Sequence, residues 1–427
     1  MYIENYGCQM NISDSDIITS ILLNHGFILS ENLDKANIIL LNACSVREKA
    51  ELTLKKRLEQ LKFYKKNKKI WIGIIGCFSK EITKFFCSRK MVDFFVSPDS
   101  YREIHNFIYY SIMGMAKKKN ETYADISFVK TKKDNKKITS FLSITRGCNN
   151  MCTFCIVPFT RGRERSSDPD SIVKECKRLY QNGYKEVTLL GQNVDSYLWI
   201  IVDFSKLLDL LAKEIPMMRI RFSTSNPHDM SNKVLEIISK HKNICKHIHL
   251  PVQSGSNKIL KLMNRKYTRE EYLFLVKKIK NIIPECSISH DIITGFCNEN
   301  EQDHQDTINL MNNIKYNYGY MFSYSPRPGT YAYRKLKDNV PQHIKKKRLQ
   351  EIIDLQRKHS FYRMQEHLGK IEEVLIEGES KKNSQYWYGR NTQNLIVVFP
   401  KKFLNIGDYA HVEIKNITSA TLIGELC

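Results

Sequence analysis

Six short apolar segments, each followed by a helical pattern, most constrain how the central part of this chain can fold. The predicted strands are residues 139–144, 186–190, 219–223, 247–250, 287–293 and 318–322. Strands that alternate with helices favour a parallel sheet covered by helices. We therefore predict a partial (β/α)6 barrel within residues 137–365, with functional residues directly after the strands.

The first predicted strand leads into three closely spaced cysteines, Cys148, Cys152 and Cys155. Thiolates at Cys-x3-Cys-x2-Cys spacing favour a common metal centre over free thiols. A structural zinc site closes with four ligands, and no Cys or His follows at a zinc-finger spacing. An iron–sulfur cluster can be held by three cysteines with one iron left open. A cluster is therefore favoured over zinc, and Phe154 would shield it on one side.

Polar residues follow the other five strands and form the predicted mouth of the barrel. Ordinary turn chemistry explains any one of these loops alone. Together they suit an adenosyl group and a nucleobase above the cysteines. The predicted cofactor-binding residues are Phe154, Gly191, Gln192, Asn193, Ser223, Gln253 and Gly295.

The N-terminal segment, residues 1–116, predicts an open parallel α/β domain. Cys8, Cys44 and Cys77 each follow a predicted strand, at residues 2–3, 37–41 and 69–75. Loops at the carboxyl ends of parallel strands line one crevice, so these cysteines can meet. Small buried residues at strand ends are the alternative. The repeated position favours a second cluster with an open iron. The following helix is predicted over residues 13–24, capped by Ser13 and Asp14.

The C-terminal part predicts three further segments. Residues 117–136 are a lysine-rich linker with an edge strand at 126–129. Residues 341–365 form a basic amphipathic helix whose charges, including Lys345 to Arg348, are expected in solvent. Period-two segments at 371–377, 394–399, 409–414 and 421–426 predict a small antiparallel β-barrel over residues 366–427. There, Tyr386, Trp387 and Arg390 either contact RNA or pack within the barrel.

The composition sets outer bounds on function. A chain of 427 residues with 42% hydrophobic and 26% charged residues is typical of two or three globular domains. The twelve cysteines and the absence of a signal-peptide pattern predict the cytoplasm. No apolar run is long enough to predict a membrane partner. The net charge of +22 is compatible with a polyanionic partner.

The cysteine spacing, with an aromatic residue before the third cysteine, resembles the signature of radical S-adenosylmethionine (SAM) enzymes. Further segments resemble the methylthiotransferase branch, and specifically the tRNA-2-methylthio-N6-dimethylallyladenosine synthases. They are residues 6–11, 42–50, 191–194, 249–256 and 324–330. The C-terminal barrel resembles a TRAM domain. Ala43, Asn226 and the Cys297–Asn298 pair depart from the family pattern without touching a predicted cluster ligand.

The resemblance implies two [4Fe-4S] clusters, one on Cys148, Cys152 and Cys155 and an auxiliary one on Cys8, Cys44 and Cys77. It implies methylthiolation at C2 of N6-isopentenyladenosine beside the tRNA anticodon, with one SAM for radical generation and one as methyl donor. The implied partners are tRNA rather than DNA, an electron donor such as flavodoxin or ferredoxin, and a sulfur source. Two alternatives remain. One is a related enzyme acting on threonylcarbamoyl-adenosine tRNA or a ribosomal-protein aspartate. The other is a non-catalytic metal- and RNA-binding protein.

Overall fold

The computed structural model describes residues 1–44, 48–78, 80–115 and 137–427. The predicted linker at 117–136, with its edge strand, lies outside these residues. The N-terminal part contains one parallel sheet in the order β1-β2-β3-β4. Its strands are Tyr2–Asn5, Ile38–Cys44, Trp71–Cys77 and Phe94–Val96. The three predicted strands are present, and β4 is an additional one.

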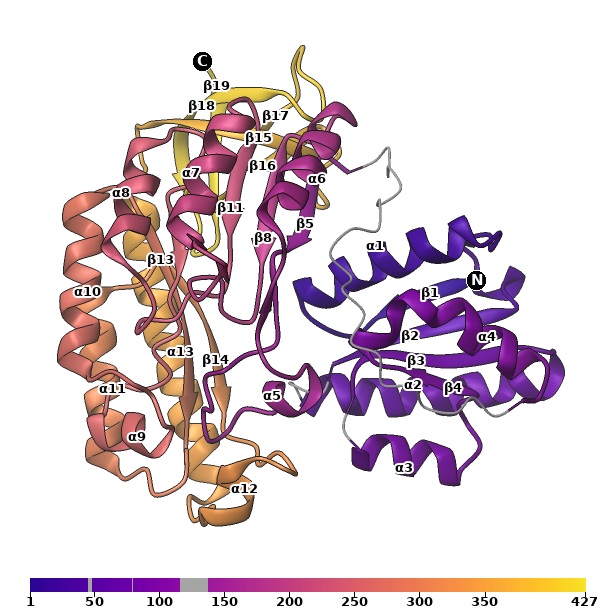
Figure 1. Ribbon diagram of the computed structural model, residues 1–427. Coiled ribbons are helices and arrows are strands. Elements are labelled where there is room, and N and C mark those ends of the chain that lie inside the picture. The colour runs from indigo at the N-terminus through magenta and orange to yellow at the C-terminus, as the bar shows by residue number, and fades with distance from the viewer. Residues whose placement is uncertain (45–47, 79, 116–136) are drawn as a thin grey trace.

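Helices cover both faces of this sheet (Figure 1). They are α1 (Gln9–Asn24), α2 (Glu48–Asn67), α3 (Lys80–Ser88) and α4 (Ile104–Ile112). Successive side chains of a strand point to opposite faces. Ile38 and Leu40 of β2 therefore pack in one core with residues of α1 and α4. Ile39 and Leu41 pack in the other core with α2 and α3. A parallel sheet covered on both sides explains why every residue of β2 is buried.

Helix α1 begins earlier than the sequence predicted. Cys8 is its N-cap, and Asn11 completes a capping box by accepting a hydrogen bond from the Cys8 backbone N–H at 3.1 Å. The predicted caps, Ser13 and Asp14, lie inside the helix and are buried. The prediction was wrong because Ser and Asp are favoured N-cap residues and Cys is not. Cys8 nevertheless serves as the N-cap, through the capping box that it forms with Asn11.

The central part contains the six predicted strands. They are β5 (Thr139–Ser143), β8 (Glu186–Leu190), β11 (Arg219–Phe222), β12 (His247–His249), β13 (Ser287–Thr294) and β14 (Tyr318–Ser323). Hydrogen bonding divides them into two parallel halves, β11-β8-β5 and β12-β13-β14. An isolated bridge between Ile220 and Ile244 connects the halves. The continuous core beneath the helices makes both halves one partial barrel.

The helices outside this barrel follow the predicted alternation (Figure 1). They are α6 (Pro169–Gln181), α7 (Phe204–Glu214), α8 (Asn232–Lys240), α9 (Asn257–Leu262), α10 (Arg269–Ile282) and α11 (Glu301–Ile314). Asp168 caps α6 by accepting a hydrogen bond from Ser171 N at 2.9 Å, as its position before Pro169 predicted. The short helices α5 (Val157–Thr160) and α12 (Tyr331–Lys335) follow the cysteine loop and β14.

The long helix α13 (Gln342–Gln365) corrects one expectation. Lys345 and Arg348 were expected in solvent but are 2% and 6% exposed. Both pair with carboxylates, Lys345 with Asp338 at 2.7 Å and Arg348 with Glu299 at 3.0 Å. A run of like charges on a helix cannot reveal which members face the protein, because the partners come from distant segments. No described helix combines the length and apolar character needed to cross a bilayer.

The C-terminal part is a closed barrel in the order β15-β16-β17-β19-β18. Its strands are Ile371–Glu379, Tyr386–Arg390, Ile396–Pro400, Tyr409–Ile417 and Thr421–Leu426. Sequence periodicity identified all but β16. β17 and β19 pair in parallel, and the other pairs are antiparallel. A small apolar core fills the barrel.

The C-terminal barrel docks against the amino ends of the central strands. Arg219, which begins β11, donates to the Arg390 carbonyl at 2.9 Å and pairs with Glu373 at 2.9 Å. Ser287, which begins β13, donates to the Gln393 carbonyl at 2.6 Å. Asn394 donates to the hydroxyl of Tyr318, which begins β14. These contacts place the C-terminal barrel at the end of the central barrel opposite the cysteine loop (Figure 1).

Candidate functional site

The three N-terminal cysteines lie at the carboxyl edge of their sheet. Cys44 and Cys77 end β2 and β3 and are register partners, and Cys8 caps α1 beside them. A hydrogen bond from the Cys44 thiol is the largest influence on Cys8. It lowers the Cys8 pKa to about 6, with the charge of Arg161 acting in the same direction against burial. Thiolate is the ligand form of cysteine, so this edge suits a metal centre.

The second set of cysteines lies in the loop between β6 (Thr145–Arg146) and α5. Cys148 is buried, and Cys152 and Cys155 are partly exposed. Burial raises the pKa of Cys148 to about 11 and that of Cys155 to about 12. Arg265 donates to the Cys152 sulfur at 3.3 Å. Metal binding at Cys148 and Cys155 would displace their protons, because cysteine binds metals as the thiolate.

A buried ion network connects Cys77 with the chain on either side of the second cysteine set. Arg161, six residues after Cys155, donates from Nε to the sulfur of Cys77 at 2.7 Å. Its Nη2 pairs with Asp14 at 2.8 Å, and Arg146 pairs with the other Asp14 oxygen at 2.9 Å. Asp14 is completely buried. The Nη1 atoms of Arg146 and Arg161 are buried and have no hydrogen-bond partner among the described residues. Further acceptors beside Cys77 would satisfy them.

The described residues contain no group of three or more Cys, His, Asp or Glu side chains that could hold a single metal ion. A [4Fe-4S] cluster is held differently, because each thiolate binds its own iron and the sulfurs stay apart. The donor set here is purely thiol, with cations beside Cys77 and Cys152. That chemistry fits two anionic clusters better than it fits two zinc ions.

The loop after β8 contains three predicted cofactor residues. A side chain at Gly191 would place its Cβ 2.0 Å from Thr145 Oγ1, so only glycine fits. Gln192 accepts a hydrogen bond from the Gly147 backbone at 2.6 Å. Asn193 donates to Asp229 at 2.6 Å, while its buried Oδ1 has no partner within the described residues. The loop thus supports the cysteine segment and leaves one amide oxygen available to a ligand.

Strained backbone marks the ends of the next two strands. Thr224, directly after the predicted residue Ser223, has a φ of +72°, and Gln253 after β12 has a φ of +73°. Such values are unfavourable for residues other than glycine and cluster at functional sites. Gln253 is held by backbone hydrogen bonds with Asp291 and Ile293 on β13. Its side chain makes no hydrogen bond among the described residues.

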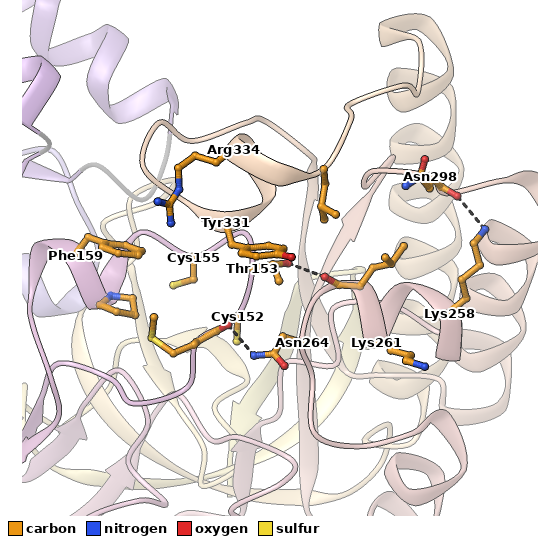
Figure 2. Close-up of a pocket in the computed structure, with 14 residues that line it drawn as sticks. Cys152, Thr153, Cys155, Phe159, Lys258, Lys261, Asn264, Asn298, Tyr331 and Arg334 are labelled. Atoms are coloured by element: carbon orange, nitrogen blue, oxygen red, sulfur yellow. Dashed lines mark hydrogen bonds between the residues drawn. The ribbon is translucent and has the colours of Figure 1, made fainter.

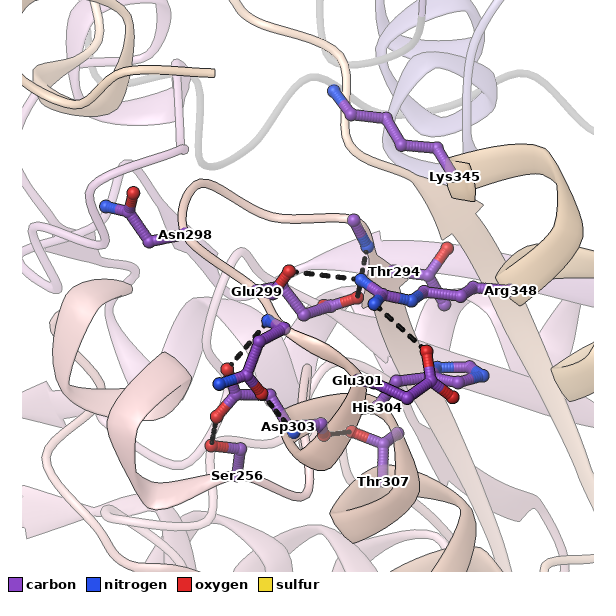
Figure 3. A network of polar contacts seen from close by, with 12 residues as sticks. Ser256, Thr294, Asn298, Glu299, Glu301, Asp303, His304, Thr307, Lys345 and Arg348 are labelled. Atoms are coloured by element: carbon purple, nitrogen blue, oxygen red, sulfur yellow. Dashed lines mark hydrogen bonds and ion pairs between the residues drawn. The ribbon is translucent and has the colours of Figure 1, made fainter. Parts of the chain in front are cut away.

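The turn after β13 is held by a polar network (Figure 3). Glu299 accepts hydrogen bonds from the Gly295 backbone at 2.8 Å and from Arg348 at 3.0 Å. Burial raises the Glu299 pKa, and Arg348 opposes that shift. Arg348 also pairs with Glu301 at 3.2 Å. Glu299 therefore has a structural role, in which it fixes Gly295 at the barrel mouth.

Phe154 is partly buried beside this turn. Its ring lies edge-on to Phe296, with ring centroids 6.3 Å apart, in a small core. A side chain at Gly295 would place its Cβ 2.4 Å from Lys345 Cγ. The cysteine loop is thus packed directly against the Gly295 turn.

The RNA-contact residues predicted in the C-terminal barrel have partners within the protein. Arg390 pairs with Glu377 at 2.7 Å. The Trp387 ring packs against the barrel core, with the Lys401 ammonium 4.3 Å from its centroid. Tyr386 is partly buried. RNA contact by all three stays a prediction.

Sequence reasoning missed Asp14, Arg146, Arg161 and Arg265 as residues near the cysteines. Arg146 and Arg161 flank the cysteine motif in Ile144–Arg163, which was the available signal. Nothing in the sequence connected Asp14 with these arginines, because it lies more than 130 positions before Arg146.

Comparison with known proteins gives matches across the chain. Residues 142–311 match the radical SAM superfamily, residues 365–427 match the TRAM domain, and residues 1–97 match the uncharacterized protein family UPF0004. A tRNA-2-methylthio-N(6)-dimethylallyladenosine synthase of Karelsulcia muelleri is 58% identical, covering 100% of this chain and 98% of that protein. The synthase of the same name from Flavobacterium psychrophilum is 51% identical, covering 100% and 93%.

Solved structures show the same fold at low sequence identity. The radical SAM methyltransferase TsrM from Kitasatospora setae, with cobalamin and a [4Fe-4S] cluster bound, has a TM-score of 0.57 at 11% identity. The match covers 75% of this chain and 74% of that one. The cobalamin-dependent SAM radical enzyme OxsB has a TM-score of 0.54 at 12% identity, covering 84% and 56%.

Proposed function

The chain belongs to the tRNA-2-methylthio-N(6)-dimethylallyladenosine synthase family, and from this premise we propose the reaction it performs. It is a radical SAM transferase that replaces the C2 hydrogen of N6-isopentenyladenosine, next to the anticodon of tRNA, with a methylthio group. The observation that carries the proposal is the buried contact between Arg161 and Cys77. It supports two cysteine triads, from separate sheets, that face one shared site.

Each triad would hold one [4Fe-4S] cluster. Cys148, Cys152 and Cys155 would hold the cluster that binds SAM, and Cys8, Cys44 and Cys77 the auxiliary cluster. One bound SAM would supply the radical chemistry that removes the C2 hydrogen, and a second SAM would supply the methyl group of the added methylthio group. An aromatic C–H has no acidic proton for a general base, so the bound cofactors supply this step.

The protein's own residues position these groups and exclude water. The unpartnered Asn193 Oδ1 and the free Gln253 side chain lie at strand ends where they can orient SAM. Phe154 and the Gly295 turn close one side of the cysteine loop. Arg161 and Arg265 donate hydrogen bonds to the sulfurs of Cys77 and Cys152, which places positive charge beside the proposed ligands.

The proposed reaction needs partners beyond tRNA. Reductive SAM cleavage requires an external electron, for which we propose a flavodoxin- or ferredoxin-type donor. The added sulfur requires a separate sulfur source. An enzyme that modifies tRNA with reduced thiols would work in the cytoplasm. The C-terminal barrel, through Tyr386, Trp387 and Arg390, is the proposed first RNA contact.

The deciding experiment measures iron, sulfide and electron paramagnetic resonance (EPR) signals anaerobically. It compares the wild type with a variant carrying Cys148→Ala, Cys152→Ala and Cys155→Ala. We expect two four-iron clusters in the wild type and one in the variant, which should also fail to cleave SAM. Mass spectrometry of isopentenylated tRNA should show the methylthio product with the wild type only. A variant without iron would disprove the auxiliary cluster.

A further inference from the structure

A large cavity borders the cysteine loop without involving the strand ends. Its volume is about 1010 Å3, and its walls come from the cysteine loop, α5, α9 and α12. That volume reaches the upper end of the usual range of small-ligand pockets, about 300–1,000 Å3. Cys152 and Cys155 lie on its wall, whereas none of the predicted SAM-binding residues does. The cavity therefore has room for a ligand beyond SAM.

Exposed aromatic rings stand at one end of this cavity. Figure 2 shows Phe159 of α5 and Tyr331 of α12 on either side of Cys155, with Arg334 beside them. Phe159 is 55% exposed and Tyr331 52% exposed. Neither side chain belongs to an apolar core of the described residues. Apolar side chains that remain exposed together beside a cavity are typical of interaction sites. Flat rings of this kind stack on unpaired bases.

The cavity also carries positive charge that the protein does not neutralise. Arg334 and Lys261 have no carboxylate partner among the described residues, whereas Lys258 pairs with Asp303 at 2.7 Å. Apolar walls with unpaired cations at the rim match a nucleotide, which combines a flat base and an anionic phosphate. They match an anionic protein segment less well, because nothing on these walls provides backbone pairing.

The C-terminal barrel cannot reach this cavity. It docks at Tyr318, the first residue of β14, whereas α12 follows the last residue, Ser323. Five steps of about 3.3 Å separate Tyr318 from Ser323, a distance of about 17 Å. A tRNA held by the C-terminal barrel alone would have no contact near the cysteines. A second RNA contact is needed there.

We propose that the cavity rim formed by Phe159, Tyr331, Arg334 and Lys261 binds the unpaired anticodon-loop nucleotides that flank the modified adenosine. Phe159 and Tyr331 stack on flanking bases, and Arg334 and Lys261 contact phosphates. This inference rests on the proposed function and adds to it the residues that seat the substrate loop. Single-stranded loops suit such recognition because their bases can be splayed outward.

The test measures the dissociation constant of the cluster-loaded enzyme for an anticodon stem-loop RNA carrying N6-isopentenyladenosine. Fluorescence anisotropy is the readout, so no turnover is needed. Tyr331→Ala and Phe159→Ala should each raise the dissociation constant about 5- to 150-fold, the range expected when an aromatic ring that stacks on one base is replaced by alanine. Arg334→Gln should reduce the slope of log affinity against log salt by about 0.7, as expected for one phosphate contact on a single strand.

Matched controls separate this contact from general effects. Phe274→Ala removes an aromatic side chain that is 68% exposed on α10, and Arg357→Gln removes a cation that is 69% exposed on α13. Both should bind RNA like the wild type. Iron content and SAM affinity should be unchanged in Tyr331→Ala and Arg334→Gln, because neither side chain is a predicted cluster ligand or SAM-binding residue. If Phe159→Ala loses its cluster, the RNA affinities of Tyr331→Ala and Arg334→Gln test the proposal.

The outcomes distinguish this inference from the function beneath it. If the wild type binds the stem-loop and the rim variants bind equally well, the rim is not an RNA site and the proposed function stands. If the wild type itself does not bind the modified stem-loop, both proposals fail. Weaker binding by the rim variants alone, with normal controls, supports the inference.

Discussion

Arg161 donates a hydrogen bond to the sulfur of Cys77 across 84 positions of sequence, and the same side chain pairs with Asp14. Arg161 comes from the segment that follows the second cysteine set, whereas Cys77 and Asp14 belong to the N-terminal part. The contact ties the segment after the second cysteine set to the N-terminal part through one buried cation. The two partners also explain how the buried charge of Arg161 is tolerated, because burying an unpaired charge costs free energy.

Removing this cation should change the electronic properties of the auxiliary cluster. Hydrogen bonds to ligand sulfurs and nearby positive charge raise the reduction potential of iron–sulfur clusters. We expect Arg161→Gln to shift the auxiliary potential to more negative values while the iron content stays the same. EPR-monitored redox titration measures the shift, and Arg161→Lys, which keeps the charge, should show a smaller one. An unchanged potential in Arg161→Gln would mean that Cys77 is not a ligand.

Asp14 should be important for stability, because it neutralises both Arg146 and Arg161. Breaking a buried ion pair by removing one partner costs about 3–5 kcal/mol. Asp14→Ala should lower the free energy of unfolding by that amount in urea titrations. Asp16→Ala, two positions along the same helix, removes an exposed pair with Lys137 at 3.6 Å and should cost about 0–1 kcal/mol. Equal effects of the two substitutions would contradict the interpretation.

The Glu299–Arg348 pair should control SAM binding through the Gly295 turn (Figure 3). Arg348→Gln leaves Glu299 buried without its counter-charge, which favours protonation and weakens its hold on the turn. We expect weaker SAM binding by calorimetry and a stability loss of about 3–5 kcal/mol. Glu301→Ala is the matched control, since Glu301 is 68% exposed and its pair should contribute at most about 1 kcal/mol. SAM affinity that is unaffected by Arg348→Gln would separate this turn from the cofactor site.

Asp195 should make stability depend on pH. Burial raises its pKa to about 7, although Asn226 N and Ser225 Oγ donate hydrogen bonds to it. An unfolded Asp titrates near 3.9, so the folded state binds the proton more tightly. Stability is therefore highest when the group is protonated, and falls as the pH rises from about 4 to about 7. Asp195→Asn should remove this loss of stability. The urea midpoint of the variant minus that of the wild type should therefore increase from pH 5 to pH 8. A constant difference over that range would show that Asp195 titrates normally.

Local patterns were sufficient for much of this protein. The strand periodicity located the six central strands, and Asp168 before Pro169 identified the start of α6. The spacing of Cys148, Cys152 and Cys155 indicated a metal centre because ligands so near in sequence must be near in space. These inferences depend on neighbouring residues, whose geometry is set by backbone dihedrals and side-chain periodicity.

The tertiary structure decided what depends on distant partners. Lys345 and Arg348 look like solvent charges in sequence and are buried because Asp338 and Glu299 meet them after packing. The docking of the C-terminal barrel against the amino ends of the strands, and the meeting of Arg161 with Cys77, likewise need the folded chain. The docking of whole helices and strands specifies such pairs. The free-energy cost of burying one charge is offset only when its partner is buried beside it. Neighbouring residues thus specified most of the helices and strands and the cysteine spacing, whereas the pairing of the buried charges required the folded chain.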